Sequence, residues 1–172
     1  MKIIDLSVSI QKGMFVYPGD PEVDIEQLHT IAEDEWNMKR LHLNSHDGTH
    51  VNAQVHCVEN GRSLDDYDLA EFCGNAVIYK PGVAVGPETG VVFREVLTME
   101  IAKQLLPSRP KFFGLSKEAD ESVEKFLLKH DAVLFERLSN TEELPERFEF
   151  FGVPLKITDG DGSPVRAFAV VR

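Results

Sequence analysis

Alternating hydrophobic and polar positions recur along the chain and predict a protein built mainly of β-strands. In residues 2–10, for example, Ile4, Leu6, Val8 and Ile10 would share one face of an extended strand. Turn-forming segments rich in glycine and proline separate the similar runs that follow. Further strands are expected within residues 38–46, 49–57, 74–80, 89–96, 111–116, 132–138, 148–157 and 163–171.

Helical periodicity is found in only three segments. In the first, Ser63 can cap a short helix or helical turn together with Asp66, three residues later. The second begins at Thr98 and has to end before Pro107. The helical segments are expected at residues 63–72, 98–106 and 118–131. Many strands with few helices among them indicate either a mixed α/β or an α+β protein.

The length of the chain, 172 residues, suits one domain with a buried core, and we expect a single domain over residues 1–172. No repeat or linker-like segment divides it. The first ten residues carry a lysine and an aspartate within their apolar run, which is poor for a signal peptide. No stretch is apolar enough to span a bilayer. These features predict a cytoplasmic protein without a membrane partner.

Acidic residues dominate the charge, because 29 Asp and Glu stand against 18 Lys and Arg and give a net charge of −11. Such a surface repels phosphate backbones, and no cluster of Lys and Arg offsets it. We therefore expect no nucleic-acid partner.

The two cysteines, Cys57 and Cys73, have no CxxC spacing and are expected to be small buried residues without a disulfide. A thiol nucleophile at Cys57 activated by its neighbour His56 is disfavoured. Adjacent residues of an extended strand point to opposite faces.

Three histidines, His46, His50 and His56, fall within eleven positions of the segment SHDGTHVNAQVHC, although the whole chain has only six. One interpretation is a polar strand that happens to be rich in histidine. The other is a site for a divalent metal, which several imidazoles can hold when they converge. The close spacing favours the metal site.

Local geometry supports that interpretation. If residues 49–57 form one strand, His50, Asn52 and His56 share a face of it. A turn at Asp47–Gly48 could then fold His46 back toward them. An asparagine at this place is unexpected, because a neutral amide oxygen is a weaker donor to a cation than a carboxylate.

The segment HDGTHVNAQVH, residues 46–56, resembles the H-x-G-T-H-x-D-x-P-x-H signature of the cyclase-like metal-dependent hydrolases, the family of bacterial kynurenine formamidase and isatin hydrolase. Other segments resemble landmarks of that family in the same order, so the resemblance covers nearly the whole chain. They are IIDLS, YPGDP, GRSLDDYDL, GNAVIY, FERLSN and VPLKITDGDGSPVRAFAV.

The resemblance implies an α/β protein with the swivelling β/β/α cyclase-like fold, in which a mixed sheet carries a few helices. It also implies a homodimer or homotetramer. The implied cofactor is a divalent metal, zinc or manganese, and the implied partner is a small-molecule substrate. In such enzymes a metal-activated water hydrolyses an amide, formamide or cyclic amide bond.

Position by position, the resemblance assigns His46 and His50 as metal ligands. Asn52 occupies the place of the ligating aspartate. His56 matches the catalytic acid/base, and an imidazole with a pKa near 6.5 can take a proton from water and return it to the leaving nitrogen. In members with two metals, Glu136 matches a ligand of the second one.

Glu124 aligns with a histidine ligand of that second site. One interpretation is that the carboxylate absent at Asn52 is regained at Glu124, which would make the site rich in oxygen donors and favour Mn²⁺ or Mg²⁺ over zinc. The other is that Glu124 is a solvated helix residue beside Lys125. Gln54 replaces the proline of the signature, and the segment before residue 111 is short, so the substrate is not carried over from the family.

The leading hypothesis is a metal-dependent hydrolase of a C–N bond. The alternative is a catalytically silent relative that keeps the fold and the oligomer but binds a small molecule or partner without turnover, because Asn52 replaces the aspartate ligand. A purely structural oligomeric domain without metal would leave the histidine cluster unexplained.

Overall fold

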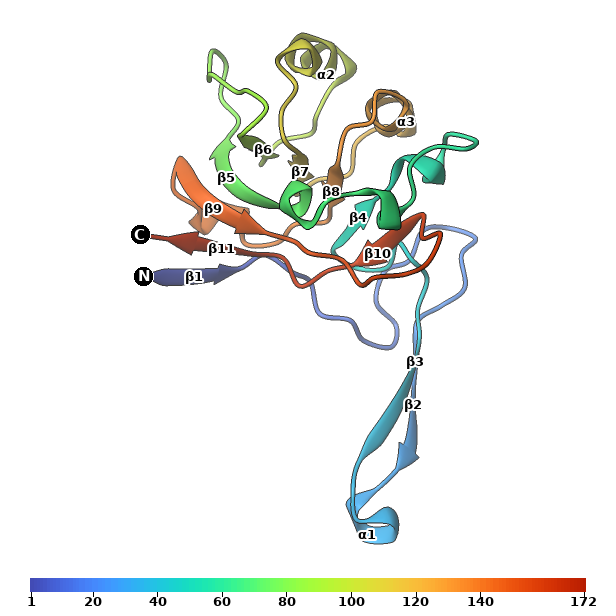
Figure 1. Ribbon diagram of the computed structural model, residues 1–172. Helices are drawn as coiled ribbons and strands as arrows, with labels where there is room; N and C mark the ends of the chain where they lie inside the picture. The colour runs from blue at the N-terminus through green and yellow to red at the C-terminus, as the bar shows by residue number, and fades with distance from the viewer.

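A curled mixed sheet of nine strands forms the body of the protein in the computed structural model, which describes residues 1–172 (Figure 1). Its strands are β1 (Lys2–Asp5), β4 (His50–Asn52), β5 (Cys73–Ile78), β6 (Gly90–Phe93), β7 (Phe113–Leu115), β8 (Leu134–Glu136), β9 (Arg147–Phe151), β10 (Gly162–Pro164) and β11 (Phe168–Val171). They are ordered β1-β11-β9-β5-β6-β7-β8-β4-β10. The pairs from β5 to β8 are parallel, and the strands on both sides pair antiparallel. The mixed sheet implied by the sequence is confirmed.

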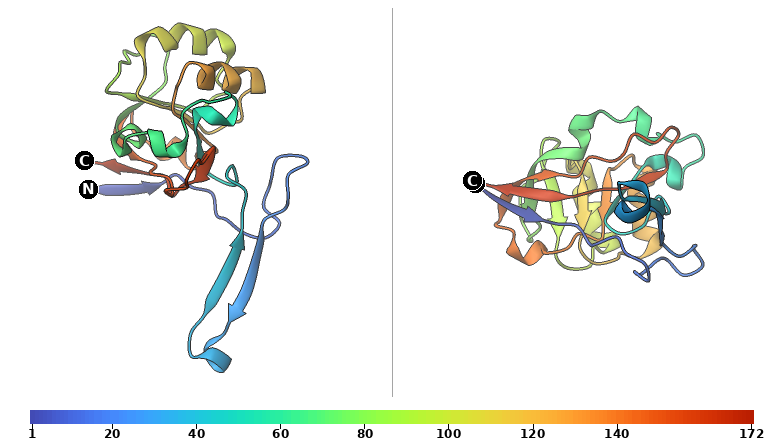
Figure 2. Two further views of the ribbon diagram at one scale, coloured as in Figure 1. Left: turned by 45° about the vertical axis from the view of Figure 1, so that its right-hand side comes forward. Right: turned by 90° about the horizontal axis from the view of Figure 1, so that it is seen from below.

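Two helices cover one face of the parallel strands (Figures 1 and 2). α2 (Met99–Leu105) links β6 to β7, and α3 (Glu121–Lys129) links β7 to β8, as parallel neighbours require a crossover connection. The Thr98 side chain accepts a hydrogen bond from the backbone of α2, so the predicted helix start is confirmed. The helical segment expected at residues 63–72 consists of two 3₁₀ turns, and Asp66 accepts a bond from the Ser63 amide (2.8 Å).

The apolar core lies on both faces of the sheet. Side chains alternate along β6: Val91 and Phe93 pack with α2 and α3, whereas Val92 packs with the larger cluster on the other face. Three aromatic rings, Phe112, Phe135 and Phe150, contact one another within that cluster. Strands buried in this way hold rigid positions for the side chains at their ends.

A second, two-stranded sheet projects from the body as an arm, residues 24–42 (Figures 1 and 2). It consists of β2 (Asp24–His29) and β3 (Met38–His42), with the single helical turn α1 (Ile31–Asp34) at its tip. Every residue of β3 is exposed. The strand expected over residues 38–46 therefore ends at His42 and belongs to the arm, not to the sheet that carries the histidine cluster.

Other predicted strands are also shorter than expected. The strand expected over residues 148–157 ends at Phe151. The segment 49–57 is extended only in β4, because the Ala53 amide bonds to the Asp161 carbonyl and the chain then enters a 3₁₀ turn at Gln54–His56. Residues 163–171 form two strands, β10 and β11, separated by a corner. At the N-terminus the chain leaves the sheet after β1, where the Val8 amide donates to the Thr49 hydroxyl (2.9 Å). No helix has the length and apolar character that crossing a membrane demands.

Candidate metal centre

A cavity of about 350 Å³ opens between α3, the β4–β8 strand pair and the loop that precedes the arm. His50 of β4 and Glu136 of β8 are direct partners in the antiparallel register, which places their side chains side by side. His46 lies on the turn before β4, and His56 lies on the 3₁₀ turn after it. Glu124 faces the same cavity from α3.

The buried imidazole of His50 is held in one orientation. Its Nδ1 lies 2.9 Å from the Gly48 carbonyl oxygen, which can only accept, so this nitrogen carries the proton. Nε2 lies 3.3 Å from Oε2 of Glu136. When the ring is protonated this nitrogen donates to the carboxylate, and when the ring is neutral it carries the free electron pair. A backbone partner that fixes the tautomer in this way is typical of histidines that bind metals.

His46 is enclosed between Asn52 and Asp161. Its Nδ1 lies 2.8 Å from Oδ1 of Asn52, and its Nε2 lies 2.9 Å from Oδ2 of Asp161. The ring packs against β10 at Gly162, where a Cβ atom would come within 2.5 Å of it. A glycine is therefore required at this position for His46 to reach the cluster.

His56 completes the group of imidazoles, although it does not lie on the strand face that the sequence predicted. Its ring centroid is 3.9 Å from that of His46. Nδ1 lies 3.4 Å from Oδ2 of Asp161, and Nε2 lies 3.5 Å from Oε1 of Glu124. Burial and the neighbouring charge of His46 lower the pKa of His56. His56 is therefore neutral at neutral pH and able to accept a proton.

The pKa values of Glu124 and Glu136 are shifted in opposite directions. Burial, together with the negative charge of Glu136, raises the pKa of Glu124 to about 7. Burial acts on Glu136 as well, but the hydrogen bond and charge of His50 and the Asn52 amide outweigh it and hold the pKa of Glu136 below its ordinary value. Glu136 is thus the permanently charged carboxylate at the centre of the site.

Asp161 is the functional candidate that sequence reasoning missed. Burial opposes its ionisation, yet hydrogen bonds from His46 and Ser45 and the charge of His46 outweigh burial and lower the pKa of Asp161 to about 2. One of its carboxylate oxygens and one ring nitrogen each of His46 and His56 lie within 4.8 Å of one another, close enough to share one cation. The only signal in the sequence was an aspartate between two glycines, which indicated a turn.

Asn52 lies between His46 on one side and the two glutamates, Glu136 and Glu124, on the other. Its oxygen contacts His46, while its amide nitrogen donates to Oε2 of Glu136 (2.8 Å) and lies 3.4 Å from Oε1 of Glu124. An amide NH₂ placed between two carboxylates reduces their mutual repulsion. In this arrangement Asn52 orients the neighbouring donors.

Glu124 lies in the cavity rather than in solvent, with its side chain 21% exposed. Of the two interpretations of this residue, the structure therefore supports the one that includes it in the cluster. Cys57 also lines the cavity, and burial raises the pKa of its thiol, which keeps it protonated. A protonated thiol is a poor nucleophile.

The donor set fits a divalent cation. Three imidazoles and three carboxylates converge, and the fixed tautomer of His50 and the ionised Asp161 and Glu136 supply donors in the form that a metal needs. The predicted ligands His46, His50, Glu124 and Glu136 and the predicted acid/base His56 are all brought together. Their individual roles stay predictions.

Comparisons with known proteins agree with this architecture. Residues 4–111 match a family model named Cyclase and described as "Putative cyclase". A kynurenine formamidase of Salinibacter ruber is 30% identical over 204 aligned residues, which cover 97% of this chain and 96% of that protein.

Solved structures share the fold. Isatin hydrolase A from Ralstonia solanacearum superposes with a TM-score of 0.83 at 18% identity, over 99% of this chain and 92% of that one. A predicted metal-dependent hydrolase from Bacillus stearothermophilus gives 0.76 at 20% identity, over 98% and 97%. Together with the sequence match over more than half of its length, these similarities show that the chain belongs to the cyclase family.

Proposed function

We propose that the protein is a metal-dependent hydrolase that cleaves the C–N bond of a small amide, formamide or cyclic amide. The observation that carries the proposal is the convergence of His46, His50 and His56 with ionised carboxylates in one cavity. The family membership supports it, because relatives of this chain are named kynurenine formamidase.

The side chains that surround Asn52 in the site would hold the cation, which we propose to be zinc or manganese. His50 offers Nε2, His46 a ring nitrogen and Glu136 its carboxylate, and Glu124 would complete a second position. Asn52 either orients these groups or contributes a weak oxygen ligand. When bound, a divalent cation lowers the pKa of a coordinated water toward 7 and polarises an amide carbonyl.

His56 would move the proton. Asp161 accepts from Nδ1 of His56, which leaves Nε2 as the basic nitrogen directed into the cavity toward Glu124. Because its pKa is lowered, His56 is unprotonated at neutral pH and can take a proton from the attacking water. The resulting imidazolium can return that proton to the leaving nitrogen, while Asp161 stabilises its charge.

Elemental analysis of protein purified without added metal or chelator tests the proposal. We expect zinc or manganese at about one ion per chain or more, lost in the His50→Ala variant and accompanied by hydrolysis of formanilide, a neutral aryl formamide. A metal content near zero that soaking does not raise would contradict it.

The alternative, a silent relative, is favoured by one observation, the neutral amide of Asn52 in place of a carboxylate. The companion variant Asn52→Asp separates the two hypotheses. If metal binding and formanilide hydrolysis appear only in that variant, the natural protein binds without turnover.

We also propose that the protein is a homo-oligomer assembled through its arm. Large apolar side chains of the arm, among them Ile31, Trp36 and Leu41, are exposed, and a two-stranded hairpin is only marginally stable alone. The segment leading into the arm supplies Tyr17 and Asp20 to the rim of the metal cavity. A second copy of the chain packed on the arm would therefore also stabilise the cavity. The cytoplasmic location and the absence of a nucleic-acid partner stay predictions.

A further inference from the structure

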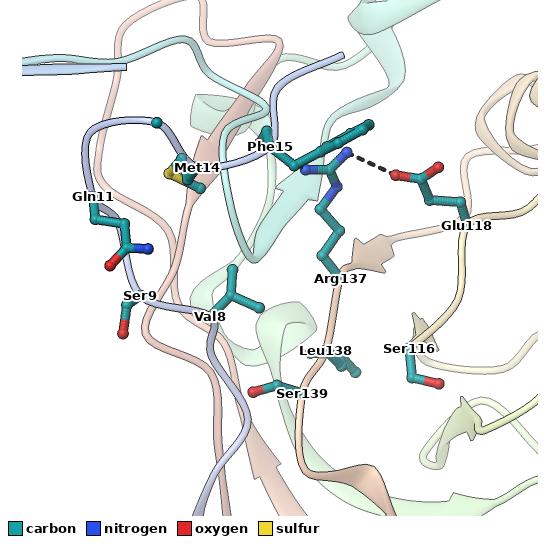
Figure 3. A pocket seen from close by; sticks show the side chains of 11 residues that line it. Val8, Ser9, Gln11, Met14, Phe15, Ser116, Glu118, Arg137, Leu138 and Ser139 are labelled. Carbon is teal, nitrogen blue, oxygen red and sulfur yellow. Dashed lines mark hydrogen bonds and ion pairs between the residues drawn. The ribbon is translucent and has the colours of Figure 1, made fainter. Parts of the chain in front are cut away.

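A second, larger cavity lies next to the metal cavity. Its volume is about 850 Å³, and its walls are the N-terminal segment 8–15 and the chain that follows β7 and β8 (Figure 3). Arg137 and Glu118 line both cavities. Nothing in the proposed hydrolytic mechanism uses this space.

Arg137 marks the boundary between the two cavities. Its guanidinium donates to Oε1 of Glu118 (2.7 Å) and to the carbonyl of Phe15 (3.2 Å), and it stacks 4.3 Å from the centre of the Phe15 ring (Figure 3). With five N–H donors in a planar fork, an arginine used in this way keeps further donors for an anion. Arg137 is the one cationic residue in the wall of the second cavity.

The backbone at Arg137 adopts a conformation that side chains disfavour, with φ at 56°. The Thr49 hydroxyl donates to the Arg137 carbonyl (2.6 Å) and holds this turn. Strained backbone of this kind persists where the surrounding structure enforces it, and it concentrates at functional sites. Here the turn follows Glu136 directly, and it places Arg137 at the boundary of both cavities while Glu136 lines the metal cavity alone.

Glu118 shows which chemical group the guanidinium binds, because its carboxylate accepts a hydrogen bond from Arg137. The Glu118 side chain is 64% exposed, whereas that of Arg137 is 18% exposed. The carboxylate is thus the easily displaced partner, and the guanidinium is the fixed one. A ligand carboxylate can take the place of Glu118 without leaving Arg137 unpaired.

A further polar group in this wall has no partner. The Ser139 hydroxyl oxygen is buried and makes no hydrogen bond within the protein. Buried polar atoms are normally satisfied, so this hydroxyl is available to bond a water or a ligand group that enters the cavity. Ser139 lines the second cavity together with apolar residues, which suits a ligand that is polar at one end.

We propose that the second cavity binds a carboxylate on the substrate, with Arg137 as its anion-binding residue. This inference rests on the proposed function. The amide of the substrate would lie in the metal cavity, and its carboxylate would bind the Arg137 guanidinium in the second cavity. There it would replace Glu118, which is the partner of Arg137 in the free protein. The substrate class is therefore a small amide that also carries a carboxylate, and Arg137 determines that specificity.

Calorimetric titration with N-benzoylglycine and its neutral analogue N-benzoylglycinamide tests the inference. We expect the purified protein to bind the acid at least tenfold more tightly than the amide. Repeating the titration after treatment with a chelator shows whether Arg137 or a metal ion holds the carboxylate, because binding through Arg137 persists without metal.

Variants identify the residue responsible. Arg137→Met keeps an unbranched stem over Phe15 and should lose at least tenfold in affinity for the acid while changing that for the amide less than threefold. Arg137→Lys should recover part of the loss. Glu118→Gln removes the competing carboxylate and should tighten binding of the acid. The melting temperature of Arg137→Met shows whether this variant is folded. If the folded variant binds the acid as tightly as the natural protein does, the inference is wrong.

The two proposals fail separately. The protein could bind N-benzoylglycine through Arg137 and yet neither hold metal nor hydrolyse formanilide. That result would overturn the proposed hydrolase, and the proposed anion site would stand. Metal-dependent hydrolysis of formanilide without such binding would overturn the anion site alone.

Discussion

At the scale of single residues, the site combines groups that the sequence places together with one that only the fold supplies. His46, His50 and His56 are close in the sequence, so a motif could find them. Asp161 follows them by more than a hundred residues and reaches them because β10 pairs with β4. A short-range pattern carries no information about such a contact, and the residue was missed for that reason.

Replacing Asp161 by asparagine should impair the site through both histidines that it contacts. The variant loses the negative charge beside His46 and His56, so we expect metal affinity to fall about 10- to 100-fold. Competition with a fluorescent chelator measures this affinity. Asp159→Asn is the matched control, because Asp159 is exposed in the same loop, and it should bind metal normally. Equal affinities in the two variants would exclude a role for Asp161.

Glu124 gives the metal-free protein a distinct dependence on pH. Its pKa of about 7 lies above the ordinary value of 4.5, so the unfolded chain releases this proton first. Stability should therefore fall as the pH rises from about 4.5 to about 7. Glu124→Gln removes the buried charge and should raise the free energy of unfolding at pH 8 by about 1–2 kcal/mol, but not at pH 4.

Urea denaturation of chelator-treated protein at both pH values measures the difference. Glu121→Gln serves as the control, because Glu121 is exposed on the same helix and its pKa is lowered by Lys125 and Tyr17. It should give no gain at pH 8. A Glu124→Gln variant that is no more stable than the natural protein at pH 8 would show that the carboxylate is not penalised by burial.

At the scale of elements, the sequence predicted best where burial enforces a pattern. The strands β5, β6, β7 and β8 and the helix α2 lie where expected, because each has a face that must be apolar. The sequence predicts a strand where the 3₁₀ turn Gln54–His56 lies, because the residues alternate in polarity while the turn depends on a distant contact of the chain with Asp161. The strand β2 was not predicted, because none of its residues is fully buried and its sequence lacks a buried stripe.

The turn that carries His56 depends on a buried tyrosine. The Tyr67 hydroxyl accepts from the Gln54 amide (3.1 Å) and donates to Asp131 (3.3 Å). Tyr67→Phe leaves the Gln54 amide without a partner and should lower the free energy of unfolding by about 1–2 kcal/mol. It should also reduce turnover by displacing His56.

Urea denaturation and formanilide hydrolysis provide the two measurements. The matched control is Tyr79→Phe, because Tyr79 stacks on Phe93 and lies away from the turn. If both variants lose equal stability, the hydroxyl of Tyr67 has no special part in holding the turn.

At the scale of the whole molecule, body and arm differ in what stabilises them. The body has a core on each face of its sheet, whereas the arm, residues 24–42, contains no buried residue. The homodimer or homotetramer that we propose would give the arm a partner. The sequence alone could not show this projection, because a hairpin that packs on its own chain has the same local pattern.

Analytical ultracentrifugation tests this assembly. We expect an oligomer for the natural protein and a monomer for a variant in which Ile31, Trp36 and Leu41 are changed to serine, because their exposed apolar surface is removed. Leu69→Ser is the control, since Leu69 is equally exposed on the body. A natural protein that sediments as a monomer at micromolar concentration would contradict the proposal.

The sharp turn between Glu136 and Arg137 has a consequence for the length of the substrate. Both residues line the metal cavity, Arg137 also lines the second cavity, and their Cα atoms are held about 3.8 Å apart by the peptide bond. The centre that would cut the bond and the centre that would bind the anion are therefore carried by adjacent residues of one turn, and the two side chains alone separate them. A substrate therefore has to match the spacing of these two groups. Molecules whose amide and carboxylate are spaced too closely or too widely would bind at only one of the two centres.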